Sequence, residues 1–337
     1  MTTDNPASRP WFVTIPPVFP THVPGAGADT RLGYRRRALS FTIGDAMKRC
    51  SSCGSVHDSV TFTCPVCEHS PEVVDGFLAF SPAMAHAGGG YDSDLFAQLA
   101  PLEEGSFWFR SRNDLILWAL RQHSPALTSF LEIGCGTGYV LSGVEAEFPR
   151  ATLLGSEVFV DALPYAAARV RAAELVQMDA RDIPLRAEVD VIGAFDVLEH
   201  IEEDVEVLGQ VHQALKADGL LVICVPQHRW LWSPADDHAQ HVRRYTAREL
   251  RAKVTGAGFD IERSTSFVSL LLPMILLSRV LMRRRTNVDP IDEMRMPAFL
   301  NAVLYRLMRL ETALIRRGVD FPLGGSRLVV ARKRAAG

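Results

Sequence analysis

The sequence predicts an α/β protein built on a doubly wound sheet with a parallel core. Short apolar runs typical of buried strands alternate with helical stretches from about residue 91. One of these runs ends in a glycine-rich turn, FLEIGCGTG (130–138). Hydrophobic residues make up 47% of the 337 residues and charged residues 22%, which is a globular composition and excludes a disordered, collagen-like or coiled-coil chain.

The order of the elements supports this fold class. The expected strands cover 130–134, 151–157, 173–179, 189–199 and 220–226. Helical stretches lie between them, for example over 161–172 and 203–217. Strands that alternate with helices favour parallel pairing through right-handed crossovers.

The glycine turn predicts a ligand site. Gly134, Gly136 and Gly138 follow a strand and precede a helix, where the missing Cβ atoms allow a tight turn and a close approach to a ligand. A dinucleotide site would have the spacing G-x-G-x-x-G, but Tyr139 stands where its third glycine would be. Glu132 precedes the turn and favours a cationic ligand over a pyrophosphate.

These residues resemble the first motif of class I S-adenosylmethionine (SAM)-dependent methyltransferases, E/D-x-G-x-G-x-G. FDVLEHIEED (195–204) resembles the fourth-strand motif of the small-molecule, ubiquinone-biosynthesis type, and LKADGLLVICVP (215–226) the fifth. YTARELRAKVTGAGFDIERS (245–264) is similar to the next helix and sixth strand, and SRLVVARK (326–333) to the last strand. The resemblance covers roughly 107–270 and implies a SAM-binding, Rossmann-like sheet of seven strands.

The resemblance also implies which residues hold SAM. Glu157 would bind both ribose hydroxyls, and Asp179 would meet the adenine amino group. Arg112, or alternatively Arg110, would pair with the carboxylate of SAM. The full implied set is Glu132, Gly134, Cys135, Gly136, Thr137, Gly138, Glu157, Asp179, Ala180, Asp196 and Arg112.

The chemistry of methyl transfer to a hydroxyl calls for a base, and His200 is the candidate. It follows Asp196 and Glu199 at the expected carboxyl end of the fourth strand, where open α/β sheets bind ligands. One alternative is a structural histidine that caps the strand. Another, implied by related quinone-type enzymes, is a divalent cation held by Asp196, Glu199 and His200. The loop 228–245 is expected near the substrate, with His241 and Tyr245 as candidate contacts.

Four of the six cysteines form two CxxC pairs, Cys50/Cys53 and Cys64/Cys67, separated by ten residues. This spacing resembles a zinc ribbon, in which each pair places two thiolates on one tetrahedral Zn²⁺. A redox dithiol would need only one pair. Four cysteine ligands leave no open position, so the predicted metal is structural.

The last two expected strands are separated by an insertion with an unusual composition. Residues 267–317 contain nine arginines and four acidic residues, with an apolar run at 267–277 and an amphipathic pattern at 297–317. A basic amphipathic segment favours contact with a membrane surface, and a helical cap or a dimer face is the alternative. Because it leaves the ligand side of the sheet, the insertion is expected to roof the site.

The predicted organisation has four parts: an irregular arm (1–44), a zinc ribbon (45–80), a SAM-binding domain (91–270 and 326–337) and a helical insertion (271–325). The expected function is O-methylation of a small-molecule or lipid-linked acceptor. An RNA methyltransferase that docks through its zinc ribbon is the alternative, although the net charge of -3 makes a nucleic-acid partner the less expected one. The absence of a signal peptide and of a long apolar span predicts a cytoplasmic protein, peripheral on the inner face of the membrane if the insertion binds lipid.

Overall fold

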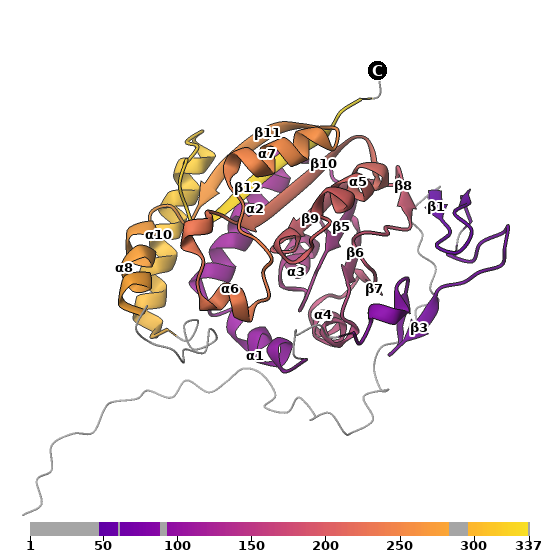
Figure 1. Cartoon of the computed structure of the whole chain (residues 1–337), viewed down its shortest axis with the longest axis horizontal. Helices are drawn as coiled ribbons and strands as arrows, with labels where there is room; N and C mark the ends of the chain where they lie inside the picture. Colours follow the sequence, from indigo (N-terminus) through magenta and orange to yellow (C-terminus); the bar gives the residue numbers. More distant parts are fainter. Residues whose placement is uncertain (1–46, 60, 88–92, 283–295, 336–337) are drawn as a thin grey trace, which may run out of the picture. The chain divides into compact units, whose positions relative to one another are not determined.

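The computed structural model describes residues 47–59, 61–87, 93–282 and 296–335 (Figure 1). A nine-stranded sheet runs through this part of the chain in the order β11-β12-β10-β9-β5-β6-β7-β4-β3. Its strands are β3 (Glu72–Val74), β4 (Phe77–Ala79), β5 (Ser129–Ile133), β6 (Thr152–Glu157), β7 (Glu174–Gln177), β9 (Val189–Phe195), β10 (Leu215–Pro226), β11 (Phe259–Phe267) and β12 (Ser326–Lys333). The predicted arm at 1–44 lies outside the described residues.

The parallel core forms as expected. β5 pairs in parallel with β6 and β9, β6 pairs with β7, and β9 pairs with β10. β12 lies antiparallel between β10 and β11. The carboxyl ends of β5, β6, β7, β9 and β10 therefore meet at one edge of the sheet, which is where a ligand site is expected.

The sheet has two strands more than the seven predicted. The hairpin β3–β4 continues the sheet beyond β7, because Leu78 and Ala79 pair in parallel with Val176 and Gln177. This pairing covers backbone groups of β7 that would otherwise form an exposed sheet edge. The boundary predicted for the zinc ribbon at residue 80 is therefore too late, since residues 72–79 belong to the main sheet.

The cysteine segment has a small sheet of its own. β1 (Met47–Arg49) pairs antiparallel with β2 (Val56–His57) and with β8 (Leu185–Arg186) of the main domain. The described residues between the two CxxC pairs contain one strand, β2, which is two residues long. The pairing with β8 attaches the segment to the sheet domain.

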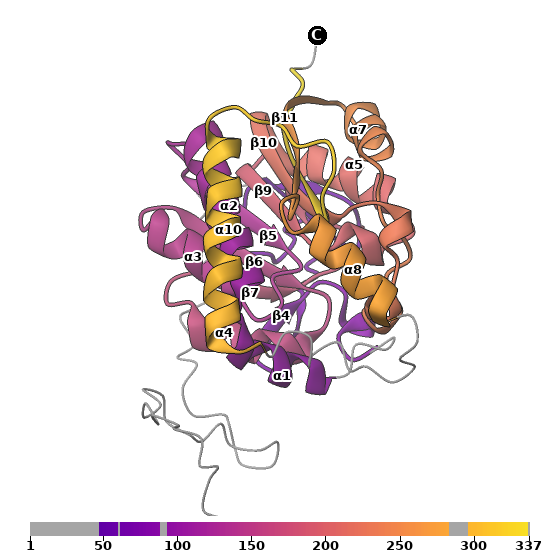
Figure 2. The same cartoon turned by 90° about the vertical axis from the view of Figure 1, so that its left-hand side faces the viewer.

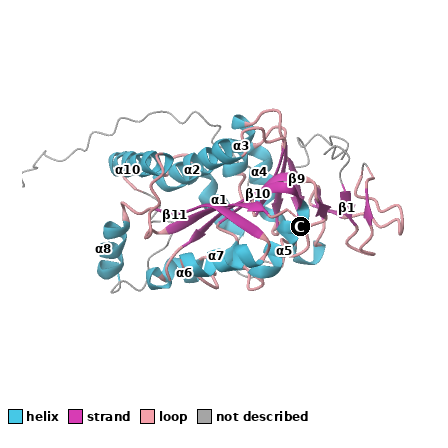
Figure 3. Cartoon of the chain, turned by 90° about the horizontal axis from the view of Figure 1, so that it is seen from above, coloured by secondary structure: helices cyan, strands magenta, loops and turns pink. Residues whose placement is uncertain are grey.

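Helices cover both faces of the sheet (Figure 3). One layer contains α2, α3, α4 and α10, whose apolar side chains pack in one core cluster with the strands. The other contains α5 and α7, which belong to a second cluster. The helices are α1 (Ser93–Glu103), α2 (Phe107–His123), α3 (Tyr139–Glu147), α4 (Leu163–Arg169), α5 (Asp204–Ala214), α6 (Pro234–His238), α7 (Ala247–Gly256), α8 (Leu272–Met282) and α10 (Ala298–Arg316).

The helix expected over 203–217 ends earlier than predicted. α5 ends at Ala214, and Leu215 already pairs with Val189 as the first residue of β10. The tertiary pairing with β9 therefore overrides the helical pattern of the last residues.

The insertion divides into two helices with different neighbours. α10 packs on α2, where the side chain of Asn301 accepts a hydrogen bond from the Phe107 N–H (2.7 Å) and the Tyr305 hydroxyl donates to Asp114 (2.7 Å). α8 lies at the ligand end of the sheet, on the same side of the molecule as α10 (Figure 2). The expectation of a roof over the site therefore holds for α8 and not for α10.

Within the ranges that the structure describes, no helix combines the length and the apolar character that a membrane crossing requires.

Candidate functional site

A cavity of about 880 Å³ lies at the carboxyl ends of the parallel strands. Its wall includes the residues that end β5, β6, β9 and β10 and the turn that follows β5. Ligand pockets of proteins typically measure about 300–1,000 Å³, so this cavity is large enough for a nucleoside donor and an acceptor together.

The three glycines of the turn have separate structural roles. All have positive φ: +65° at Gly134, +50° at Gly136 and +75° at Gly138. A Cβ atom at Gly134 would lie 2.4 Å from the Val197 side chain, and one at Gly138 would lie 2.9 Å from Ala166. A Cβ at Gly136 would meet no described atom within 4 Å, so this backbone stands open to the cavity.

Glu157 closes one side of the turn. Its carboxylate accepts hydrogen bonds from the N–H groups of Gly136 (3.1 Å), Val158 (2.8 Å) and Phe159 (3.2 Å). Burial raises the pKa of Glu157, although these N–H groups oppose the rise. Since an ionised carboxylate has about four acceptor positions, the side chain keeps capacity for a ligand hydroxyl.

Glu132 lines the cavity with a buried carboxyl group. Its side chain is buried, and Oε2 has no hydrogen-bond partner among the described residues. Burial raises the pKa of this carboxyl well above its usual value. A cation bound in the cavity would compensate the buried oxygen, so this wall fits the sulfonium or ammonium of SAM.

Thr137 is held by two residues that the sequence did not indicate. Its hydroxyl donates to Glu103 at the end of α1 (2.7 Å), and Arg169 of α4 donates to the Thr137 Oγ1 (2.7 Å) and contacts Glu103. This buried ion pair ties the turn to α1 and α4. Glu103 and Arg169 belong to no motif, which explains why sequence reasoning missed them.

Asp179 and Ala180 follow β7 and line the cavity, as expected. The Asp179 carboxylate accepts from Nε (3.0 Å) and Nη2 (2.9 Å) of Arg181, which also pairs with Glu203 (3.0 Å). The predicted contact with adenine stays a prediction, and Arg181 is a neighbour that the sequence did not indicate.

Arg112 lies in the cavity wall and forms an ion pair with Asp196. Its guanidinium stacks over the Trp108 ring with 4.5 Å to the centroid. Arg110, the alternative for binding the carboxylate of SAM, instead stacks on Tyr305 of α10 at 3.8 Å and is absent from the described wall. The geometry therefore favours Arg112 over Arg110.

A carboxylate and two histidines meet at the end of β9. Glu199, His200 and His241 have potential ligand atoms within 4.8 Å of one another. Glu199 is fully buried, and neither of its oxygens has a hydrogen-bond partner among the described residues. Burial raises the pKa of Glu199 to about 8, while burial and the neighbouring His241 lower the pKa of His200 to about 4.

His241 is oriented by Asp236. Its Nδ1 lies 2.8 Å from the Asp236 Oδ1, and the same oxygen accepts from Arg244 (2.6 Å). Burial alone would raise the pKa of Asp236, but the hydrogen bonds and charges of His241 and Arg244 lower it to about 2. Because an ionised carboxylate only accepts hydrogen bonds, the Nδ1 of His241 carries a proton in this contact.

The ligand set predicted for a divalent cation needs a correction. The structure groups His241, and not Asp196, with Glu199 and His200. Asp196 is engaged by Arg112 in an ion pair. His241 comes from the loop after β10, so spacing along the β9 motif could not indicate it.

Tyr245 was predicted as a substrate contact, and the structure places it elsewhere. Its side chain is fully buried and is absent from the cavity wall that the described residues form. Its hydroxyl donates to Asp204 (2.6 Å), which also pairs with Lys253 and Arg243. Tyr245 is a core residue because Asp204 requires donors at this buried position.

Another part of the cavity wall is apolar. It is built from α1, the start of α2, the segment that leads into α8 and the first turn of α8. These contribute Leu95, Phe96, Leu99, Phe107, Phe109, Val268, Leu271, Met274 and Ile275. One cavity thus joins a polar, carboxylate-rich wall to a hydrophobic one.

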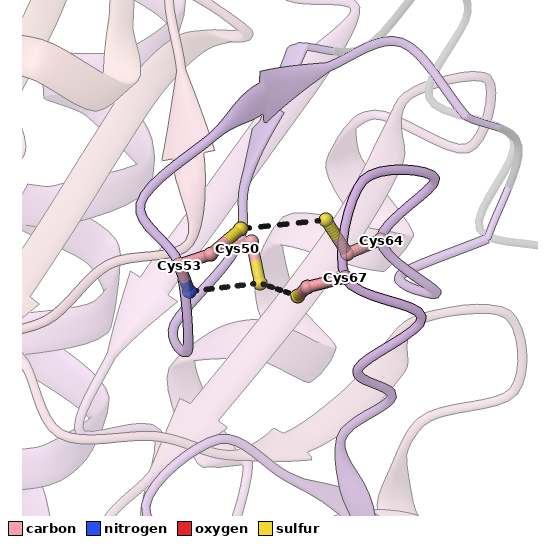
Figure 4. Close-up of side chains that lie close together, drawn as sticks. All are labelled: Cys50, Cys53, Cys64 and Cys67. Carbon is pink, nitrogen blue, oxygen red and sulfur yellow. Dashed lines mark hydrogen bonds between the residues drawn. The ribbon is translucent and has the colours of Figure 1, made fainter.

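The four cysteines of the two CxxC pairs converge (Figure 4). The Sγ–Sγ distances are 3.6 Å for Cys50–Cys67 and 3.7 Å for Cys53–Cys64. All four thiols are free, and a disulfide would need about 2.05 Å. Zn–S bonds of about 2.3 Å in a tetrahedron require sulfur atoms about 3.8 Å apart, so the cluster fits a zinc ion.

The fold and the cavity define the class of protein as a SAM-dependent methyltransferase with a Rossmann-like sheet. Residues 93–264, about half of the chain, match the family described as "Methyltransferase domain", and the chain belongs to this family.

Relatives agree with this family. The chain is 30% identical over 166 residues to a "Probable S-adenosylmethionine-dependent methyltransferase" of Mycobacterium tuberculosis, covering 47% of this chain and 57% of that protein. A protein of the same description from Mycolicibacterium smegmatis is 28% identical over 165 residues, covering 48% and 62%. The chain thus spans about three fifths of the length of these relatives. The fold is similar to Haemonchus contortus phosphoethanolamine N-methyltransferase 2 solved with S-adenosyl-L-methionine (TM-score 0.50, 17% identity, 77% of this chain and 61% of that one).

Proposed function

We propose that this enzyme transfers a methyl group from SAM to a hydroxyl of a small, apolar or lipid-linked acceptor. One observation carries the proposal: a single cavity joins the glycine turn with Glu132 and Glu157 to a hydrophobic wall from α1, α2 and α8. The polar wall suits the donor and the apolar wall suits the acceptor, so both reactants fit one cavity.

The residues of this site provide for removal of the hydroxyl proton. Asp236 orients His241 through its Nδ1, and His200 lies beside His241 with a ring-centroid distance of 4.8 Å. His200 is largely neutral near pH 7 because its pKa is lowered to about 4. We assign the role of general base to this histidine pair, with His241 as the better oriented member and Asp236 as its positioning residue.

A divalent cation is a second proposal for the same place. Glu199, His200 and His241 form a carboxylate–dihistidine set, and the buried Glu199 oxygens would gain a partner from a bound cation. Such an ion would lower the pKa of an acceptor hydroxyl. Turnover that survives EDTA treatment would contradict this role and leave the histidines as the base.

The cysteine cluster is proposed to hold one structural Zn²⁺. The four sulfur atoms have the separations that tetrahedral zinc requires, and this small segment has little apolar core of its own. The cysteine segment pairs with the sheet domain through β8. In the sequence, the four cysteines precede the methyltransferase motifs by more than 60 residues.

Methyl-labelled SAM tests the proposed reaction. Purified protein is incubated with host extract, which is then divided into lipid, small-metabolite and RNA fractions. We expect label in the lipid or metabolite fraction. A Glu157→Ala variant, which loses hydrogen bonds at the SAM wall, serves as the inactive control. Label in RNA would contradict the proposal and support the alternative of RNA docking through the cysteine module.

A further inference from the structure

The outward face of α10 is apolar. Phe299, Leu307 and Leu310 are 82%, 39% and 53% exposed. The opposite face is also apolar, with Leu304 and Met308 buried against the core. A surface helix of a globular protein normally presents polar residues to solvent, so this second apolar face needs a partner.

The exposed charges on α10 have one sign. Arg306, Arg309 and Arg316 are exposed, and Arg317 follows directly after the helix. Glu311, the single acidic residue in the sequence of α10, is buried and accepts hydrogen bonds from the Ser269 N–H (2.9 Å) and the Leu270 N–H (2.8 Å). The exposed surface of this helix therefore combines apolar side chains with positive charge.

α8 adds exposed apolar side chains on the same side of the molecule (Figure 2). Met274, Leu276 and Leu277 are 40%, 41% and 59% exposed. Met274 and Ile275 also line the cavity. The exposed apolar surface of α8 is thus continuous with the hydrophobic wall of the proposed acceptor site.

We propose that this face, named here the α8–α10 face, docks on the surface of an anionic lipid bilayer. It consists of Met274, Leu276, Leu277, Phe299, Leu307 and Leu310, with the arginines of α10. Apolar side chains flanked by arginine are the pattern of helices that lie in the membrane interface. Positive charge without exposed acidic residues on α10 complements anionic headgroups.

A second copy of the chain fits the α8–α10 face less well than a bilayer does. A symmetric dimer through this face would bring the α10 arginines of both copies together without acidic partners from that helix. The docking itself does not depend on catalysis. The supply of a lipid-linked acceptor from the membrane to the cavity, which Met274 lines, does rest on the proposed function.

Vesicle co-sedimentation of the full chain tests the docking. Vesicles contain phosphatidylcholine alone or a 3:1 mixture with phosphatidylglycerol, at about 0.1 M salt. We expect binding to the anionic vesicles that falls as salt is raised. The Arg306→Glu/Arg309→Glu variant should lose at least about tenfold in apparent affinity. Leu307→Ser/Leu310→Ser should lose about tenfold through its smaller apolar surface.

Matched controls separate the face from general effects. Arg248→Glu/Arg251→Glu makes the same charge change at exposed arginines of α7, and Val73→Ser/Val205→Ser removes apolar side chains that are 61% and 54% exposed elsewhere. Both controls should bind like the unaltered protein. Circular dichroism checks that α10 stays folded in the test variants.

Three results would overturn the docking. They are no binding to anionic vesicles, equal losses of vesicle binding in test and control variants, or a dimer in light scattering that is absent in the Leu307→Ser/Leu310→Ser variant. Vesicle binding with no label in either the lipid or the metabolite fraction would overturn the proposed function alone. Methylation in detergent without vesicle binding would overturn the docking alone.

Discussion

The cysteine cluster and the histidine site are both places where several ligating side chains meet, but they are assembled differently. Cys50 and Cys67 lie 17 positions apart, and all four cysteines come from one short segment. His200 follows β9, whereas His241 and Asp236 come from the loop after β10. The comparison teaches that spacing predicts a site when one segment builds it, and that pairing of distant strands hides a site from sequence reasoning.

The largest expected effect concerns the cysteine cluster, which one segment builds. Cys53→Ser/Cys67→Ser should reduce zinc from about one ion per chain to almost none, because two thiolates cannot hold a structural zinc ion. Elemental analysis measures the metal, and limited proteolysis of residues 47–70 reports on folding of the segment. Ser52→Ala, an exposed change within the first pair, should keep the zinc. Protein purified without zinc would contradict the proposal.

The next effect concerns the histidine site, whose residues come from distant segments. His241→Gln should lower kcat by about 10²–10⁴-fold, since it removes the oriented proton acceptor. SAM affinity, measured by calorimetry, should be unchanged. His228→Gln is the control, because His228 stacks on Trp230 in the same loop. If His200→Gln lowers kcat more than His241→Gln does, the base is His200, as the sequence alone suggested.

Asp236 should act through His241. Asp236→Asn keeps the shape but weakens the charge that fixes the Nδ1 proton, and we expect kcat to fall about 10–100-fold with little change in KM. Steady-state kinetics measure both constants. Asp237→Asn, at a neighbouring exposed carboxylate that accepts from Trp232 (2.9 Å), should be neutral. Equal kcat values for the two variants would show that Asp236 does not position the histidine.

The smallest effect separates positioning from stability. Ser233 caps α6 and lies 3.1 Å from the Asp236 carboxylate, so Ser233→Ala should cost about 1 kcal/mol and lower kcat severalfold. Thr246→Ala is the control, because Thr246 caps α7 in the same way: its hydroxyl accepts a hydrogen bond from the Glu249 N–H (3.1 Å). It should cost about the same in urea unfolding and leave kcat unchanged. A decrease in kcat in both variants would trace the effect to stability alone.

Much of the fold could be predicted because its signals are local. The apolar strands, the glycines that require positive φ and the CxxC spacing are each legible within a few residues. Gly134 illustrates this, since both its φ of +65° and its contact with Val197 exclude a larger residue. The predictions that failed involved long-range partners. Tyr245 donates a hydrogen bond to Asp204, Arg112 forms an ion pair with Asp196, and β7 pairs with the hairpin β3–β4.

The sequence by itself therefore determined the methyltransferase class, the position of the glycine turn, Glu157 and the four cysteines. These depend on backbone conformation and on spacing within one segment. Only the tertiary structure decided that His241, held by Asp236, joins Glu199 and His200, and that α8 but not α10 covers the cavity. Burial and charge compensation act between distant segments, so such partners are fixed only when the strands and helices have packed.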